Sequence, residues 1–519
     1  MLFNSYIFIF VFLPITVFGY YYIGRRGHYN FSIFWLVVAS LVFYAYWNPI
    51  YLSLILGSIV FNYLIGASLS LENARHKRIK LAFGVFINLS IIGYFKYANF
   101  LVDNIVQLFA ADFVLNTIIL PLAISFFTFQ QIAFLVDAYR GETKELNFLH
   151  YLLFVTFFPQ LIAGPIVHHK EMLPQFARNQ SHKINHKKIL AGLSIFSIGL
   201  FKKVVVADGI AQLSTPVFDA AVQSDSSITF IEGWAAALGY TFQLYFDFSG
   251  YSDMAIGLAL LFGIQLPINF NSPYKASSII DFWRRWHMTL SRFLRDYLYI
   301  PLGGSRKGRL RQYVNLLITM LIGGLWHGAG WTFIIWGGLH GFYLLFNYFW
   351  RRITSILKVN YFFNGVLGKY FGMAITFVVV VIAWVIFRTE NVDSALRIYQ
   401  GMSGYNGIVF PSQLERIIPG VCSVFECSPY LNEVFGQVNK PYYVLWLPVL
   451  LLWVWFAPNV KDLCFNINEN TQFPYLRKSN EVMWWHWRPG IISGAIAGGI
   501  AFISVLHLTK VSEFLYFQF

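Results

Sequence analysis

Charged residues are scarce in this sequence: they make up 12% of its 519 residues, whereas hydrophobic residues make up 57%. That balance excludes a soluble globular protein. Apolar runs of spanning length recur from one end of the chain to the other, which is far more than one signal peptide or anchor explains. The sequence therefore predicts an all-α polytopic membrane protein with about 11–13 transmembrane or re-entrant helices.

Cysteine is also rare, and the three cysteines have no metal-site spacing. Cys422 and Cys427 can pair if their loop faces an oxidising compartment, or they remain two free thiols. His182 and His186 have the spacing of metal ligands on a helix, but no third ligand candidate lies nearby. We therefore predict no metal site, and the absence of a G-x-S-x-G elbow predicts no soluble hydrolase-like domain.

Acidic residues number 24 against 38 basic ones, which gives a net charge of +14. The basic residues cluster in short loops between apolar runs, and no basic groove interleaved with aromatic residues suits a nucleic acid. The basic loops, expected on the cytoplasmic side, cover residues 25–28, 72–80, 167–188, 351–358 and 477–488. Their alternation places both termini outside an inner membrane, with lipid as the surrounding partner, and we predict one integral domain over residues 1–519.

Individual spans follow from the same apolar runs. The expected spans are residues 3–22, 31–46, 52–69, 151–164, 189–206, 371–387, 442–456 and 490–507, and Pro159 is expected to interrupt the fourth. Residues 81–131 hold at least two more, and residues 388–440 form a long mixed segment that is expected outside the membrane.

The stretch 271–341 organises the rest of the chain and is the candidate catalytic core. Residues 279–298 are expected to form one amphipathic helix, capped at its start by Ser278 with Asp281. Its polar face carries Arg284, Arg285, Arg292 and Arg295. His287 alone breaks the pattern, because it lies within the apolar face. A lone histidine in that position is more often a packing residue than a catalyst.

His327 follows a hydrophobic run and is surrounded by glycines, which allow backbone, substrate or another helix to approach closely. A titratable group within a membrane segment is costly and indicates function. Asp247 and Asp253 also interrupt an apolar run, residues 241–263. These two carboxylates either bond to neighbours to stabilise a helix break or contact substrate.

Four motifs carry a family resemblance: FDFSGYSDMAIG, FWRRWH, RDYLYIPLGG and GLWHGAGWTF. They resemble the bacterial branch of the membrane-bound O-acyltransferase family, which acylates cell-surface polymers. The resemblance implies helices ringed around a central tunnel, and it matches His327 to the family's invariant histidine and His287 to a second, less uniform one. It implies a cytoplasmic thioester donor, acetyl-CoA or an acyl carrier, with no bound cofactor.

The same resemblance implies that an acetyl group crosses the membrane to an extracytoplasmic polysaccharide, with help from a separate periplasmic acetyltransferase of the SGNH type. An alginate-like exopolysaccharide is the favoured acceptor, and peptidoglycan or cellulose are the alternatives. A polymer or lipid transporter with a histidine proton relay is the alternative from another class.

Acyl transfer to a hydroxyl needs a base near neutral pH, a role for which histidine is suited. His327 is the expected base, His287 orients it or the donor, and the Trp326 indole or glycine amides stabilise the oxyanion. The four arginines of the polar face either attract the phosphates of the donor or anchor the cytoplasmic surface: Arg284, Arg285, Arg292 and Arg295.

The C-terminal aromatic motif, residues 514–519, is either an interfacial anchor or an acyl carrier. It resembles the tyrosine-bearing tail of the small partner in D-alanylation, which implies that Tyr516 receives the acetyl group.

Overall fold

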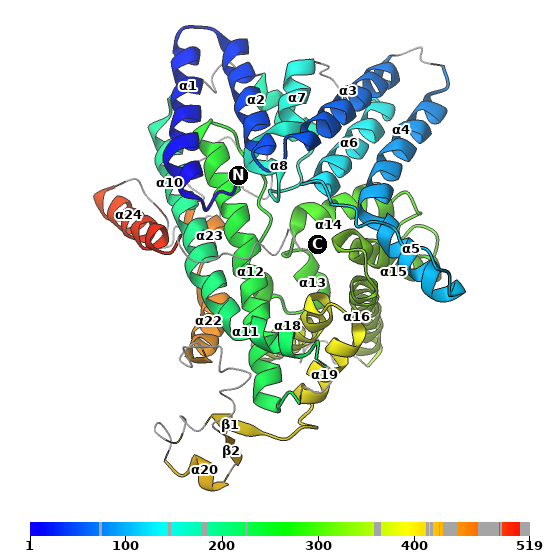
Figure 1. Ribbon diagram of the computed structural model, residues 1–519, viewed down its shortest axis with the longest axis vertical. Helices are drawn as coiled ribbons and strands as arrows, with labels where there is room; N and C mark the ends of the chain where they lie inside the picture. Colours follow the sequence, from blue (N-terminus) through cyan, green and yellow to red (C-terminus); the bar gives the residue numbers. More distant parts are fainter. Residues whose placement is uncertain are drawn as a thin grey trace. The chain divides into compact units, whose positions relative to one another are not determined.

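The computed structural model describes residues 1–71, 75–143, 147–177, 184–223, 227–357, 365–411, 415, 419–424, 426–428, 444–464, 487 and 490–508. Within these ranges the chain is almost entirely helical, as Figure 1 shows. The strands are β1 (Val409–Pro411) and β2 (Glu426–Ser428), which form one short parallel pair. The predicted all-α class is confirmed.

Five helical stretches in the described residues are long and apolar enough to cross a membrane. They are Phe8–Arg25, Ile50–Ser70, Lys77–Phe109, His186–Ala220 and Val366–Arg388, and shorter apolar helices cover Tyr29–Ala45, Trp446–Phe456 and Ile491–Leu506. Their lipid-compatible surfaces carry large exposed apolar side chains such as Phe18, Leu64 and Phe86. A polytopic membrane protein accounts for both features.

The chain divides into two compact units, each assembled from separate stretches. The first unit takes Met1–Phe201 and Gly250–Asn269, together with α23 (Val460–Cys464) and α24 (Ile491–Leu506). The second unit takes Lys202–Ser249 and Phe270–Asn459. The long helix α12 (Phe230–Leu261) supplies residues to both.

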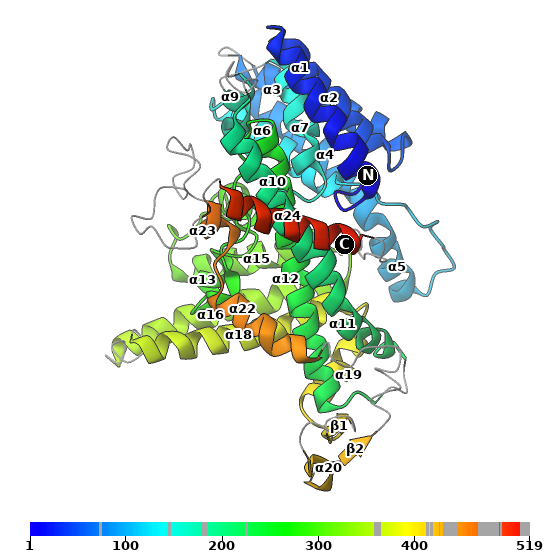
Figure 2. The same cartoon turned by 90° about the vertical axis from the view of Figure 1, so that its left-hand side faces the viewer.

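The first unit is a set of packed helices. In chain order they are η1 (Phe8–Phe12), α1 (Leu13–Arg25), α2 (Tyr29–Ala45), α3 (Ile50–Ser70), α4 (Lys77–Ile92), η2 (Gly93–Tyr97), α5 (Ala98–Phe109), α6 (Ile124–Tyr139), α7 (Phe148–Thr156), α8 (Phe158–Leu161), α9 (His169–Phe176) and α10 (His186–Phe201). Helices α3, α4 and α6 pack together (Figure 1), and α24 packs across α10 (Figure 2).

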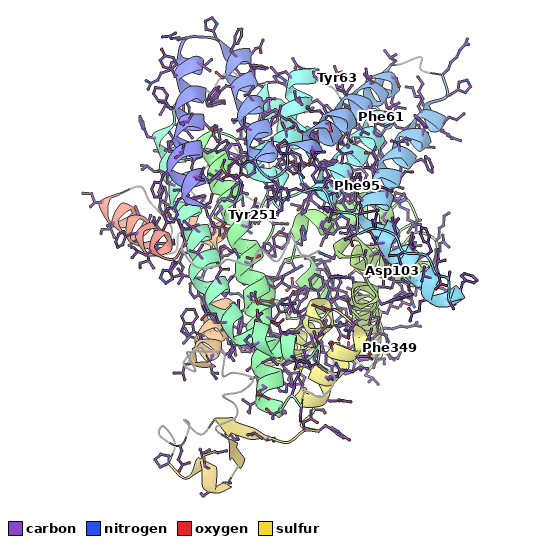
Figure 3. The ribbon with its side chains drawn as sticks, in the orientation of Figure 1. Phe61, Tyr63, Phe95, Asp103, Tyr251 and Phe349 are labelled. Carbon is purple, nitrogen blue, oxygen red and sulfur yellow. A yellow bond between two sulfur atoms is a disulfide. The ribbon has the colours of Figure 1, made fainter. Side chains whose placement is uncertain are left out.

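A buried amide pair joins α3 to α4. The Asn62 and Asn88 side chains each donate to the other's amide oxygen, at 3.2 and 2.7 Å. Polar side chains that hydrogen-bond across apolar helices stabilise their association, because the partners have no water to bond instead. Aromatic contacts add to this: Phe61 on α3, labelled in Figure 3, packs edge-on against Phe83 of α4, with centroids 5.9 Å apart.

The stretch 151–164 is interrupted next to Pro159, as expected, but the expectation that it spans the membrane is wrong. Helix α7 ends at Thr156, Phe157 leaves the helical conformation, and α8 covers only Phe158–Leu161. Pro159 lacks the N–H that a continuous helix would use to bond residue 155 and therefore favours a new helix start here. Both pieces are largely buried and too short to span a bilayer.

The second unit holds the candidate catalytic core. Its elements are η4 (Lys202–Ala207), α11 (Asp208–Ala220), the first part of α12, η5 (Pro273–Lys275), α13 (Ile279–Trp283), α14 (Met288–Leu294), η6 (Arg295–Tyr299), α15 (Arg309–His327), α16 (Trp331–Ile356), α18 (Val366–Arg388), α19 (Val392–Met402), β1, α20 (Val421–Val424), β2 and α22 (Trp446–Phe456). Helices α15 and α16 form a tight pair, joined by only three residues.

Glycines let α15 and α16 approach closely. A Cβ at Gly324 would collide with the Phe333 carbonyl oxygen, and a Cβ at Gly337 would collide with that of Met320. Small residues at a helix crossing bring two backbones into direct contact. The glycines near His327 are expected to let backbone, substrate or another helix approach closely. The structure shows the third of these, the close approach of another helix.

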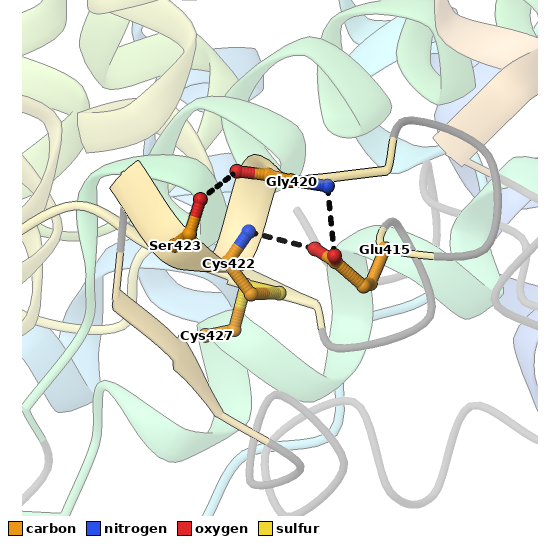
Figure 4. The surroundings of a disulfide bond; sticks show 5 residues. All are labelled: Glu415, Gly420, Cys422, Ser423 and Cys427. Atoms are coloured by element: carbon orange, nitrogen blue, oxygen red, sulfur yellow. Dashed lines mark hydrogen bonds between the residues drawn. A yellow bond between two sulfur atoms is a disulfide. The ribbon is translucent and has the colours of Figure 1, made fainter.

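The two cysteines whose pairing the sequence left open are joined by a disulfide. Beside it, the Glu415 carboxylate accepts hydrogen bonds from the backbone N–H groups of Gly420 and Cys422, at 2.8 and 2.7 Å (Figure 4). Disulfides persist in oxidising compartments; the extracytoplasmic placement expected for this segment stays a prediction.

Candidate active site

The expected single helix over residues 279–298 is wrong, because it is broken at His287. Helix α13 ends at Trp283, α14 begins at Met288, and His287 between them has φ 41° and ψ 54°. This left-handed conformation is rare for a non-glycine residue. The Ser278 cap is present, since its hydroxyl accepts from the Asp281 N–H at 3.3 Å.

The break is stabilised by the preceding loop. The Asn271 backbone N–H donates to the Arg285 carbonyl oxygen at 2.9 Å, which satisfies a carbonyl that the interrupted helix leaves free. Residues in such sparsely populated conformations persist only where their surroundings hold them, and they cluster at functional sites. The strained backbone therefore points to His287 independently of its side chain.

The His287 ring is enclosed completely, with 0% of the residue exposed. Phe248 of α12 packs edge-on against it, with centroids 4.8 Å apart. Burial lowers the pKa of His287 to about 3, so its imidazole is neutral at physiological pH. A neutral ring can donate one hydrogen bond and accept another, which suits a residue that orients a partner.

His327 is the last residue of α15 and is 8% exposed. Aromatic rings surround it: Trp326 at 4.9 Å, Trp336 at 5.2 Å and Phe387 at 5.3 Å between centroids. The His287 ring lies 6.4 Å away. The structure thus brings together two histidines that are 40 positions apart in the sequence, inside an apolar and aromatic environment.

Trp326, the expected oxyanion donor, contacts both histidines. Its ring centroid lies 4.9 Å from His327 and 6.1 Å from His287, and the residue is buried. Its position beside both rings is compatible with the proposed role, which stays a prediction.

The two candidate arginines differ in their surroundings. Arg284 is exposed, whereas the Arg285 guanidinium pairs with the Asp281 carboxylate at 2.9 Å and also donates to the Asn271 carbonyl oxygen at 3.4 Å. Arg285 therefore helps to fix the loop before the helix break. Arg284, which is exposed, is the more accessible of the two to a phosphate group. Phosphate binding by either residue stays a prediction.

Asp247 is part of a buried ion cluster. The Lys203 ammonium lies 2.6 Å from the Asp247 carboxylate and 2.7 Å from that of Asp208, and the Lys203 side chain is 1% exposed. A lysine in that environment is stabilised only by such partners. Because Asp247 precedes Phe248, the cluster anchors the part of α12 that contacts His287. Asp253 is buried further along α12, in the first unit.

The sequence reasoning missed two features here. Lys203 lies within the expected span 189–206. Its charge in an apolar run is the one feature of the sequence that indicates a buried partner. His340, in the GLHG that ends the core stretch, was also passed over. It is fully buried on α16, and the Trp283 indole N–H donates to its Nδ1 at 3.3 Å.

Tyr516 and His182 lie outside the described residues. His186 begins α10 and is exposed. Among the residues that the structure describes, no group of three or more His, Cys, Asp or Glu side chains could hold a metal ion.

Lys203→Met should destabilise the protein strongly, because it leaves two carboxylates buried without their cation. Breaking a buried ion cluster from one side costs about 3–5 kcal/mol, whereas replacing all its members can be nearly neutral. We expect Lys203→Met to accumulate poorly in membranes and the apolar triple variant Lys203→Met, Asp208→Leu, Asp247→Leu to recover. Immunoblotting of membranes and thermal unfolding in detergent measure both.

The triple variant also separates the two roles left open for Asp247. If it is abundant and active, Asp247 is needed only to pair with Lys203. If it is abundant and inactive, a substrate contact by Asp247 gains support. Normal abundance of the single Lys203→Met variant would contradict the ion-cluster argument.

The fold and this site define a polytopic membrane protein with two buried histidines at a helix break and a helix end. A model of the membrane-bound O-acyltransferase family matches residues 137–387, a range that contains both. The chain is 43% identical to the peptidoglycan O-acetyltransferase of Helicobacter pylori, over 100% of this chain and 98% of that protein. It is 44% identical to the probable alginate O-acetylase AlgI of Pseudomonas aeruginosa, over 78% and 75%.

A more distant relative is the teichoic acid D-alanyltransferase of Streptococcus thermophilus, 28% identical over 51% of this chain and 68% of that protein. The chain belongs to the membrane-bound O-acyltransferase family and is an O-acyltransferase. The resemblance found in the sequence motifs is confirmed.

Proposed function

We propose that this enzyme is an inner-membrane O-acetyltransferase that passes an acetyl group from a cytoplasmic thioester to an extracytoplasmic glycan. The observation that carries the proposal is the pair of buried histidines, His287 and His327, 6.4 Å apart within the region that matches the family. An apolar enclosure suits this chemistry, because electrostatic stabilisation of a transition state is stronger where water is excluded.

We place peptidoglycan before an alginate-like polymer as the acceptor, which reverses the order favoured from the motifs. Identity is nearly equal for the two kinds of relative, at 43% and 44%. Coverage differs: the peptidoglycan enzyme aligns over 100% of this chain, and the alginate enzyme over 78%. Similarity along the full length supports a shared acceptor and shared partners more than similarity over part of it.

His327 acts as the base in the proposed reaction. It takes the proton from an attacking hydroxyl, whose oxygen adds to the thioester carbonyl carbon. The carbon–sulfur bond then breaks, and the thiol leaves with the proton returned by the imidazolium. His287 holds His327 or the donor in position, and Trp326 is a candidate donor to the oxyanion.

The orientation is part of the proposal. Basic loops lie on the cytoplasmic side, both termini lie outside, and Arg284 meets the phosphates of acetyl-CoA or of an acyl carrier. A separate periplasmic acetyltransferase would receive the acetyl group and complete the transfer to the glycan.

Deletion of the gene, with complementation, tests the acceptor. We expect the deletion strain to lose O-acetyl esters from purified peptidoglycan, measured as acetate released by mild base, and to keep the amount of glycan unchanged. Loss of acetate from an exopolysaccharide alone would indicate that an alginate-like polymer is the acceptor. Loss of polymer export, with normal acetylation of the remainder, would favour the transporter.

A further inference from the structure

His340 carries an unused hydrogen-bond donor in the catalytic unit. The residue is 0% exposed, and its Nε2 atom has no hydrogen-bond partner within the described part of the chain. Its other ring nitrogen, Nδ1, accepts the Trp283 indole N–H at 3.3 Å. In the neutral ring, a nitrogen that accepts a hydrogen bond carries no proton, so the proton resides on Nε2. His340 is therefore held in the tautomer that presents Nε2–H.

A second buried donor lies on the same helix face. Trp336 precedes His340 by one helical turn, and their ring centroids are 4.8 Å apart. Trp336 is 1% exposed, and its indole Nε1–H also has no partner among the described residues. Burying a donor without a partner is costly, so native proteins rarely keep two together without an acceptor to receive them.

One of these two rings lies next to the expected base. The Trp336 ring packs edge-on against His327, with centroids 5.2 Å apart and planes at 87°. Phe387 and Trp384 contact Trp336 as well, at 5.0 and 5.5 Å, so the indole is held in place. Two buried N–H donors, one on a ring that contacts the base and one on the next ring along the same helix, are the kind of fixed, water-excluded groups that an acyl-transfer site uses.

We propose that the Trp336 Nε1–H and His340 Nε2–H groups bind the carbonyl oxygen of the acyl group while it is transferred beside His327. This assignment rests on the proposed function, because it takes His327 as the base. In it, Trp283 is a positioning residue: its N–H keeps Nδ1 of His340 unprotonated and leaves the donor on Nε2.

Two substitutions at His340 separate this site from simple packing. Gln places an N–H near the position of Nε2 but cannot reproduce the Nδ1 acceptor, whereas Asn reproduces the acceptor for Trp283 and does not reach the Nε2 position. If the donor matters, His340→Gln keeps more activity than His340→Asn. If only the bond to Trp283 matters, the order is reversed.

Trp336→Phe gives an independent test, because it removes the N–H and keeps an aromatic ring. With purified full-length protein in liposomes, acetyl-CoA as the donor and water as the acceptor that yields acetate, we expect the thiol-release kcat of Trp336→Phe and His340→Asn to fall by about 10²-fold. KM should change little, since the carbonyl oxygen gains charge only in the transition state. Thermal unfolding of each variant identifies one that fails to fold.

Three results would overturn the assignment. These are a wild-type kcat for Trp336→Phe, a His340→Asn variant at least as active as His340→Gln, or a loss confined to thermal stability, as expected if the donors bind only trapped water. His327→Ala, measured in the same assay, distinguishes the two proposals. If activity disappears in His327→Ala and persists in the other variants, the proposed function stands and the assignment of Trp336 and His340 as donors is wrong.

Discussion

The His327→Ala variant is expected to lose about 10²–10⁴-fold in acetyl-transfer rate, the contribution typical of a general base. It should still accumulate in the membrane, because His327 is the last residue of α15 and its loss interrupts no helix. Removing one buried ring that contacts Trp326, Trp336 and Phe387 should lower the free energy of unfolding by about 1–3 kcal/mol. O-acetyl content of the purified glycan, normalised to enzyme abundance, measures the effect.

His28→Ala is a matched control, since His28 is exposed at the start of α2 and lies in the other unit. It should acetylate as well as the wild type does. His287→Ala should lose less activity than His327→Ala, in keeping with a supporting role. Equal and complete loss at normal abundance would mean that the two histidines act as one unit. Wild-type acetylation by His327→Ala would contradict the assignment of the base.

The membrane class and the main helices could be predicted because they depend on long apolar runs, which the sequence displays directly. The pairing of His287 with His327 is a different matter, since no period links positions 40 residues apart. The sequence marks each histidine separately, because each is a titratable group in apolar surroundings. The structure places their rings 6.4 Å apart.

The helix break at His287 could not be read from the sequence. Residues 279–298 have a helical period throughout, and a period reports which side chains share a face without reporting the φ of one residue. The residue that breaks the helix is not glycine or proline, so no local signal marks it. What holds the break is the hydrogen bond from Asn271 to Arg285, a contact set by the folded chain.

The ion cluster and the buried donors depend on tertiary structure in the same way. Asp247 was recognised as an unusual carboxylate, but its partner Lys203 lies 44 positions earlier, on a different element. His340 lacked any signal of its own beyond an i, i+4 relation to Trp336. Both were found only when the burial and hydrogen-bond partners of each polar atom were known.

In the proposed function the acetyl group passes from the site of His327 to a partner outside the membrane, and Tyr516 is the residue we propose for that step. By the proposed orientation, the C-terminal motif lies on the extracytoplasmic side, on which the acceptor is found. Its six residues carry four aromatic side chains, and Tyr516 alone among them bears a hydroxyl. Tyr516 itself lies outside the described residues, and its proposed role rests on the sequence of the motif and on the chemistry of its phenol.

In the proposed relay, His327 removes the phenol proton of Tyr516, and the phenolate oxygen attacks the thioester carbonyl. The carbon–sulfur bond breaks, the thiol leaves with the proton, and the acetyl group is carried as a phenyl ester. A hydroxyl of the periplasmic partner then attacks that ester and releases the phenolate, which takes up a proton. Phenolate is a good leaving group, so the ester keeps the reactivity that a second transfer requires.

Tyr516→Phe should abolish acetylation while the protein remains normally abundant, because it removes only the nucleophilic oxygen and keeps the ring. Phe514→Leu is the matched control: it removes an aromatic ring from the same motif, leaves the hydroxyl, and should keep most of the activity. Base-released acetate from the glycan and enzyme abundance in membranes are measured for both. If the motif is only an interfacial anchor, Tyr516→Phe acetylates as the wild type does, and any loss appears instead in the abundance of Phe514→Leu.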